Sequence, residues 1–127
     1  MSIPVNAQVS AAPNFAASLA EASAFFKAQD AASAVERTRK LKAGLREMTR
    51  VLRWAPTSGR PARFLNAQSV QAQLRAEAVV QLAREVGLPH LREFVVDPFV
   101  VLYAHGEAEV VLLAIKHHRQ LAYSAAQ

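Results

Sequence analysis

The sequence predicts an α+β fold, in which an antiparallel sheet packs against an N-terminal helical hairpin. The sheet is expected from three apolar, β-branched runs between residues 91 and 123. Asp97-Pro98 and His105-Gly106-Glu107 separate these runs with residue types that reverse a chain. The hairpin is expected from two stretches with helical periodicity in the first half of the chain. Residues 1–127 contain no repeat, linker or change in composition, so we expect a single domain.

The chain is expected to begin with a strand, because apolar residues alternate with polar ones over residues 3–10. Pro4 cannot donate a ladder hydrogen bond, so we expect either that it is the strand's first residue or that the strand lies at an edge of the sheet. The first helix is then predicted over residues 15–29, with Asn14 as its N-cap.

Asp30 is the predicted N-cap of a second helix, which Pro56 ends. Apolar residues keep helical spacing along one side of it, namely Ala34, Leu41, Leu45, Met48 and Leu52. Basic residues keep the same spacing along the opposite side, namely Arg39, Lys42, Arg46, Arg50 and Arg53. We therefore expect the apolar side to pack in the hairpin and the basic side to face outward.

The second half of the chain adds a loop, an inserted helix and the meander. Residues 57–61 have the composition of a loop, and residues 62–65 are a possible short strand. Residues 68–86 are predicted to form a further helix, which Gly87 ends. The meander follows, and a short final helix is possible after His118.

Charge and composition narrow the classes of function. Residues 37–63 hold nine basic residues and one acid, Glu47, a local charge of +8 in a chain of net charge +5. Such a field favours an acidic protein or a phosphate backbone as the partner. The chain has no cysteine, and its four histidines lack the spacing of metal ligands, so we expect no disulfide, metal site or cofactor. No signal-peptide pattern or membrane-length apolar run is present, which favours a cytoplasmic protein with no membrane partner.

A series of short motifs carries a resemblance to a known family. They are Trp54-Ala55-Pro56 leading to Ser58-Gly59-Arg60-Pro61, then Leu91-Arg92-Glu93, then Phe99-Val100-Val101-Leu102-Tyr103, then Ala114-Ile115-Lys116-His117-His118-Arg119. In this order and spacing, the chain resembles the RelE/ParE superfamily of toxins from bacterial type II toxin–antitoxin pairs. The resemblance covers about residues 16–123, and the helix predicted at 68–86 is an insertion in the family's compact pattern. It implies the hairpin-on-sheet fold, an antitoxin encoded beside the toxin, and growth arrest when the antitoxin is degraded.

The superfamily includes enzymes, and the resemblance implies candidate residues for their chemistry. Members similar to RelE cut messenger RNA in the ribosome, for which the candidate catalytic residues here are Arg92, His117, His118 and Tyr123. His117 or His118 would be the acid or base, and Lys116 and Arg119 would help to hold the phosphate. At most one of the two histidines is expected to face a given groove, because neighbouring strand residues point to opposite faces. The alternative interpretation is that these polar residues are simply the solvated end of the last strand.

Members similar to ParE bind and poison DNA gyrase with no known chemistry of their own. We favour this branch, because the hairpin is pronounced and the nuclease set is incomplete. A ribosome-dependent mRNA endoribonuclease is the alternative, and a non-toxic protein-binding relic is a second one. The residues predicted to bind a partner or nucleic acid are Arg39, Lys42, Arg46, Arg50, Arg53, Arg60, Arg63, Lys116 and Arg119. For those on the second helix we favour docking of an acidic antitoxin over phosphate contact or a merely solvated surface.

Overall fold

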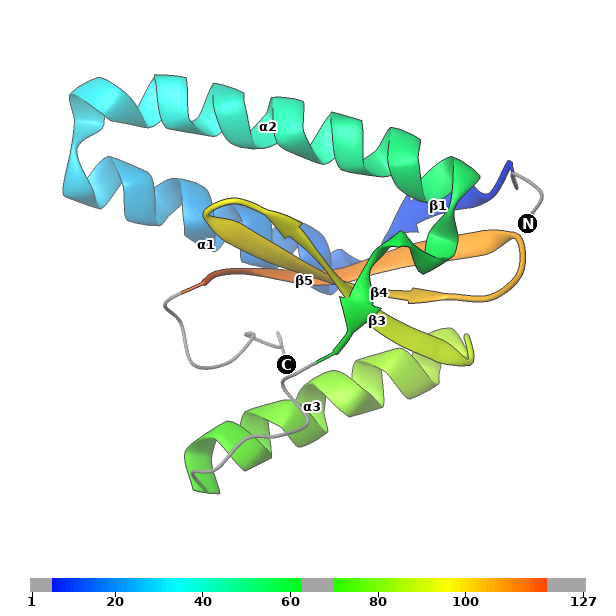
Figure 1. Ribbon diagram of the computed structural model, residues 1–127. Coiled ribbons are helices and arrows are strands. Elements are labelled where there is room, and N and C mark those ends of the chain that lie inside the picture. The colour runs from blue at the N-terminus through cyan, green and yellow to red at the C-terminus, as the bar shows by residue number, and fades with distance from the viewer. Residues whose placement is uncertain (1–5, 63–69, 119–127) are drawn as a thin grey trace.

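The computed structural model describes residues 6–62 and 70–118, with side chains over 6–62 and 77–118 (Figure 1). The elements are β1 (Gln8–Ala11), α1 (Pro13–Gln29), α2 (Ala31–Trp54), the 3-10 turn η1 (Pro56–Ser58), β2 (Arg60–Pro61), α3 (Val70–Val86), β3 (His90–Val96), β4 (Phe99–His105) and β5 (Glu109–His117). The predicted hairpin, inserted helix and meander are therefore confirmed. The short strand lies at β2, before the predicted residues 62–65, whereas residues 63–69 and the possible helix after His118 lie outside the described residues. None of the described helices is long and apolar enough to cross a membrane.

The sheet has five strands in the order β1-β5-β4-β3-β2. β3, β4 and β5 form the predicted antiparallel meander. The N-terminal strand predicted over residues 3–10 is found at Gln8–Ala11, at an edge of the sheet. It runs parallel to β5, so the sheet is mixed rather than wholly antiparallel. Alternation of apolar and polar residues predicts a strand but carries no information on the direction of its partner.

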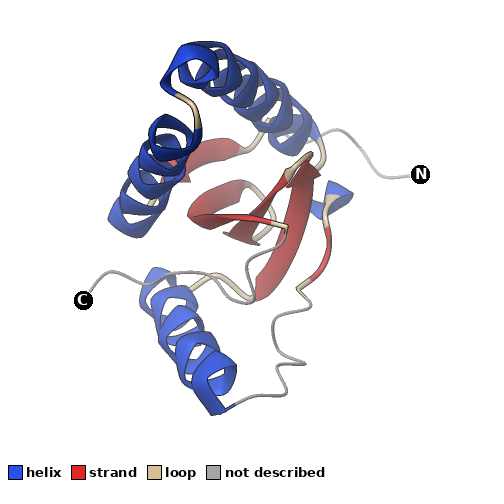
Figure 2. Cartoon of the chain, turned by 90° about the vertical axis from the view of Figure 1, so that its left-hand side faces the viewer, coloured by secondary structure: helices blue, strands red, loops and turns tan. Residues whose placement is uncertain are grey.

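The three helices lie in two layers on opposite faces of the sheet (Figure 2). The α1–α2 hairpin packs on the face that carries Phe99, Val101 and Tyr103 of β4. Helix α3 packs on the other face, where Val79 meets Val100 and Leu102. All seven residues of β4 are buried, because both of its faces are covered, and this explains its continuous apolar sequence.

Helix α2 follows its prediction closely. The Asp30 side chain accepts a hydrogen bond from the Ala32 amide at 3.0 Å and so caps the helix. The predicted apolar residues are buried or partly buried in the hairpin core. Gly44 lies where α2 approaches β3, and a Cβ atom there would be 2.6 Å from Cγ1 of Val96. The glycine therefore permits close packing between helix and sheet.

The predicted cap at Asn14 is wrong. Ala12 is the N-cap of α1 and makes no side-chain cap hydrogen bond, with Pro13 in the first turn. Asn14 is instead buried, and its Nδ2 donates to the Leu113 carbonyl at 3.0 Å. Leu113 lies at a β-bulge, because Leu112 and Ala114 pair with consecutive residues of β4. The asparagine thus satisfies a carbonyl at a point where the ladder is interrupted.

Candidate functional site

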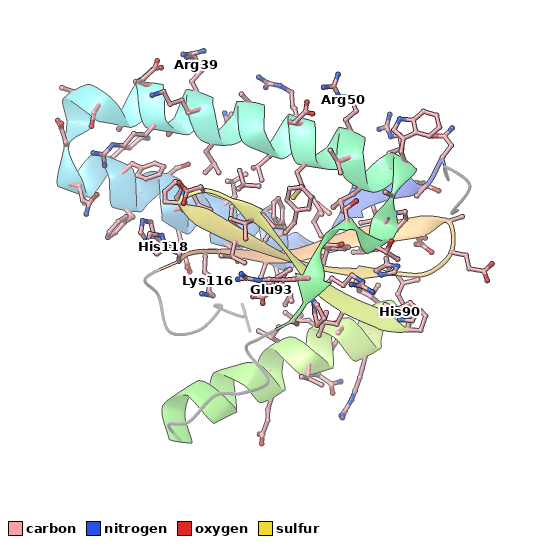
Figure 3. The ribbon with its side chains drawn as sticks, in the orientation of Figure 1. Arg39, Arg50, His90, Glu93, Lys116 and His118 are labelled. Atoms are coloured by element: carbon pink, nitrogen blue, oxygen red, sulfur yellow. The ribbon has the colours of Figure 1, made fainter. Side chains whose placement is uncertain are left out.

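The predicted basic residues of α2 form an exposed surface that points away from the sheet. We call Arg39, Lys42, Arg46, Arg50 and Arg53 the basic face, and all five side chains are exposed. Arg39 and Arg50 are labelled on it in Figure 3. Arg39 pairs with Glu36 at 2.6 Å, and Arg50 pairs with Glu47. Exposed pairs of this kind stabilise a helix by only a few tenths of a kcal/mol, so these carboxylates can exchange readily for those of a partner.

A second cluster holds the loop that leads from α2 to β2. The Tyr103 hydroxyl donates to the Pro56 carbonyl at 2.6 Å and accepts from the Gly59 amide at 2.9 Å. Arg92 donates from its terminal nitrogen to the Gly59 carbonyl at 3.0 Å and from Nε to Nε2 of His105 at 3.1 Å. We call Arg92, Tyr103 and His105 the loop clamp. It leaves no room for a side chain at residue 59, where a Cβ atom would lie 2.5 Å from the Tyr103 oxygen.

The ionisation of the loop clamp follows from its burial. Burial raises the pKa of the Tyr103 hydroxyl. Burial also lowers the pKa of His105; the hydrogen bond with the Gly106 carbonyl opposes this effect, whereas the neighbouring His90 and Arg92 add to it. Because the arginine can only donate, Nε2 of His105 accepts, and its Nδ1 donates to the Gly106 carbonyl at 3.0 Å. The clamp therefore contains a neutral imidazole of fixed tautomer.

A charged cluster lies on the opposite face of the sheet, the one that α3 covers. Arg60, opposite Glu93 in the β2–β3 ladder, has its Nε 3.8 Å from Oε1 of that carboxylate, which is only 3% exposed. Lys116 of β5 lies nearby, as Figure 3 shows. Burial lowers the pKa of the Lys116 ammonium, and the Glu93 carboxylate acts in the opposite direction. Sequence reasoning identified Arg60 and Lys116 as binding residues but missed Glu93, whose signal is that it is the single acid in β3.

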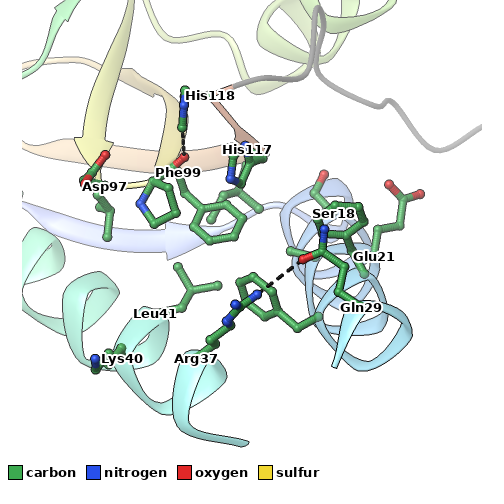
Figure 4. Close-up of a pocket in the computed structure, with 16 residues that line it drawn as sticks. Ser18, Glu21, Gln29, Arg37, Lys40, Leu41, Asp97, Phe99, His117 and His118 are labelled. Carbon is green, nitrogen blue, oxygen red and sulfur yellow. Dashed lines mark hydrogen bonds between the residues drawn. The ribbon is translucent and has the colours of Figure 1, made fainter. Parts of the chain in front are cut away.

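The end of β5 lines a pocket beside the helical hairpin. This pocket has a volume of about 780 Å³ and lies between α1, α2 and the turn that joins β3 to β4 (Figure 4). We call it the hairpin pocket, and its lining includes Phe25, Arg37, Lys40, Val96, His117 and His118. The two imidazole rings stack with centroids 4.5 Å apart. The expectation that only one of them faces a given groove is wrong, because β5 ends at His117 and the chain turns at His118.

The structure separates Arg92 from the predicted catalytic histidines His117 and His118. His117 is opposite Phe99 in the sheet, whereas Arg92 is opposite Tyr103. These positions are four residues apart along β4, or about 13 Å at roughly 3.3 Å per residue. Arg92 is also engaged in the loop clamp. Arg63, Arg119 and Tyr123 lie outside the described residues. Over the ranges that the structure describes, no three His, Asp or Glu side chains are grouped as metal ligands would be.

Comparisons with known proteins give a likeness of fold. No protein-family model matches the sequence, and no curated protein matches it. The structure is similar to a chain of the solved structure described as "Chromosomal ParDE TA system from P. aeruginosa", with a TM-score of 0.56 and 14% sequence identity. The match covers 88% of this chain and 96% of that chain. At this identity the likeness shows a common fold.

Proposed function

We propose that this chain is the toxin of a type II toxin–antitoxin pair and that it arrests growth by binding and poisoning DNA gyrase. The observation that carries the proposal is the fold, which the chain shares over 88% of its length with a chain of a toxin–antitoxin structure. The order of short motifs from Trp54 to Arg119 supports the same superfamily. The proposed partners are thus gyrase and a cognate acidic antitoxin.

The geometry favours a toxin that acts by binding. Cleavage of RNA at one phosphate requires an acid, a base and a cation within contact distance of the reacting atoms. Arg92 lies in the loop clamp, about four strand residues from His117 along β4. A toxin that acts by binding does not need an acid, a base and a cation close together. It needs a surface for its partner, and we assign this role to the basic face.

Growth and gyrase assays test the proposal directly. Induced expression of the chain should stop growth, switch on a DNA-damage reporter and leave transcripts uncut. The purified protein should inhibit supercoiling by gyrase and leave the relaxing activity of a type I topoisomerase unchanged. Full gyrase activity in the presence of excess folded protein would exclude gyrase as the target.

A ribosome-dependent ribonuclease is the second candidate, favoured by the arrangement of His117 and His118. Their rings share the hairpin pocket with the cations Arg37 and Lys40, a combination that suits acid–base work next to a phosphate. Expression should then produce transcripts cut within ribosome-bound codons. Full toxicity of the His117→Ala, His118→Ala double variant would remove this candidate. Harmless expression of the folded wild-type chain would instead support a protein-binding relic.

We propose the basic face as the docking surface for the antitoxin. The double reversal Arg46→Glu, Arg50→Glu should weaken binding of an antitoxin encoded beside this chain by about tenfold at low salt, and should flatten its salt dependence. The single reversals Arg46→Glu and Arg84→Glu form a matched control, since they make the same change in charge and the exposed Arg84 lies on α3; only Arg46→Glu should weaken binding. Equal affinities of the wild type and the basic-face variant would show that the basic face is only solvated.

A further inference from the structure

The loop clamp connects a titratable side chain to the loop between α2 and β2. Arg92 makes both bonds of this connection, because its terminal nitrogen donates to the Gly59 carbonyl at 3.0 Å and its Nε donates to Nε2 of His105 at 3.1 Å. An arginine side chain has only donors, so the second bond exists only while Nε2 of His105 carries no proton. The position of Arg92 on the loop therefore depends on the protonation state of His105.

A second proton on the His105 ring would have to bind at Nε2. The other ring nitrogen, Nδ1, already donates to the Gly106 carbonyl at 3.0 Å. Protonation of Nε2 would place two N–H donors and two positive charges against each other, which is a repulsive contact. The ring itself is 2% exposed and packs 5.9 Å from that of Tyr103, so Arg92 is the group that must move.

The surroundings of His105 offer no compensation for a second positive charge. The side chains beside it on the three strands are those of His90 and Arg92 on β3, Tyr103 on β4 and Val110 on β5. The loop presents the backbone groups of Pro56 and Gly59 to the clamp. The acids that follow in sequence, Glu107 and Glu109, are both exposed, and Glu109 points to the opposite face from Val110. Protonation would thus bring a second positive charge beside Arg92.

The loop has few other attachments to the sheet. Tyr103 bonds to Pro56 and Gly59, and β2 pairs with β3 over only two residues. One of these two is Pro61, opposite Arg92, which has no N–H to donate. Strand β4, in contrast, is paired along its whole length between β3 and β5. The loop can therefore open at a lower free-energy cost than the sheet.

We propose that the loop clamp is an acid-sensitive switch, in which protonation of His105 displaces Arg92 and releases residues 56–61 while β3, β4 and β5 stay paired. The switch is independent of the proposed function. The loop begins three residues after Arg53 of the basic face, so its release changes the surface next to that face.

The pH range of the switch follows from the pKa of His105. In the open loop this pKa takes its ordinary value of 6.5, whereas burial lowers it in the closed loop. The open loop therefore binds the proton more readily, and opening becomes easier as the pH falls from 6.5 toward the closed-loop pKa. Within this range the opening constant should rise by about tenfold per pH unit, and above it the constant should not change.

Amide hydrogen exchange of the whole chain, followed by NMR from pH 7.5 to 5, measures the opening. The protection factor of the Gly59 amide should be constant down to about pH 6.5 and should then fall by up to about tenfold per pH unit. The amides of β4 should remain at least about tenfold better protected at each pH, because the loop opens without the sheet.

Three variants assign the effect to the clamp. His105→Gln keeps an uncharged acceptor for Arg92, so Gly59 should stay protected down to pH 5. His90→Gln is the matched control, with the same change in the neighbouring ring, whose centroid lies 4.8 Å away, and it should retain the fall. Arg92→Met removes both donors, so Gly59 should be about tenfold less protected than in the wild type already at pH 7.5, with no further fall in acid.

Equal protection of Gly59 at pH 7.5 and pH 5 in the wild type would overturn the proposal. So would equal protection of Gly59 and the β4 amides, which would show that acid opens the whole fold, or a loss of the fall in His90→Gln. If His105→Gln does not fold, Arg92→Met and the ring nitrogens of wild-type His105 decide the matter. Nitrogen NMR at pH 7.5 should show the proton on Nδ1, and a proton on Nε2 would overturn the proposal.

Discussion

The substitution Tyr103→Phe removes a single oxygen atom from the centre of the loop clamp. Tyr103 is fully buried, and its hydroxyl is bonded to both the Pro56 carbonyl and the Gly59 amide. The phenyl ring remains, so packing is nearly conserved. The main effect is that one acceptor and one donor at the loop lose their partner.

The expected loss of stability follows from those two groups. A buried polar group left without a partner costs roughly 1–3 kcal/mol. Pro56 is buried and Gly59 is half-buried, so we expect the free energy of unfolding to fall by about 2–4 kcal/mol for the pair. That is a large share of the roughly 5–15 kcal/mol that stabilises an ordinary domain, yet it leaves the variant folded. At about 4 °C per kcal/mol, the Tm should fall by roughly 8–16 °C.

Urea unfolding of the wild type and two variants measures this effect. The matched control is Ser58→Ala in the same loop, which removes an exposed hydroxyl that donates to the Ala55 carbonyl at 2.7 Å. It should cost less than about 0.5 kcal/mol. Because burial raises the pKa of Tyr103, the wild type should also lose stability as pH rises above 10 and through the folded pKa. The Phe variant should lose less. A Tyr103→Phe variant as stable as Ser58→Ala would refute the idea that this hydroxyl holds the loop.

Three further changes test other contacts. Burial depresses the pKa of His105 below 6.5, so the free energy of unfolding of the wild type should fall as the pH drops from 6.5 through the folded pKa. Measured by urea unfolding from pH 7 to 5, the free energy of unfolding of His105→Gln should depend less on pH. Asn14→Ala removes the side chain that donates to the Leu113 carbonyl, and it should lower the free energy of unfolding by about 1–3 kcal/mol in the same assay. A loss near zero would show that this hydrogen bond does not stabilise the fold. Gly44→Ala should destabilise the chain despite the better helix propensity of alanine, because its Cβ meets Val96. Val96→Ala should reduce that cost in a double-mutant cycle, and additive effects would show that the contact is unimportant.

The helices were predictable from the sequence because their signals are local. Asp30 caps α2 through an amide two residues away, and the apolar side of α2 is visible in its spacing. Asn14 has the composition of a cap, but its partner is a carbonyl 99 residues later in the chain. Likewise, nothing in residues 8–11 reveals that their neighbour in the sheet is β5 or that it runs parallel to them. Such facts depend on long-range packing, which single-residue patterns do not encode.

For the candidate sites too, the features with a local sequence signal were predictable and those that depend on long-range packing were not. The basic face was predictable, because five cations on one side of a helix need only a helical period. The roles of Arg92 and Glu93 were not, since adjacent residues of β3 point to opposite faces and enter different clusters. The hairpin pocket also escaped prediction. Its walls come from α1, α2 and the end of β5, and only the tertiary fold brings them together.

The parallel pairing of β1 with β5 bears on how the chain is made. Gln8 pairs with Glu109, so the first described strand finds its place only after the last one has left the ribosome. Until then the α1–α2 hairpin can form from local contacts, but its apolar side has no sheet to cover. Pairing of segments so distant in sequence is slow compared with helix formation. A nascent chain should therefore pass through a state with an open hairpin, and a partner that recognises this hairpin could bind before the sheet is complete.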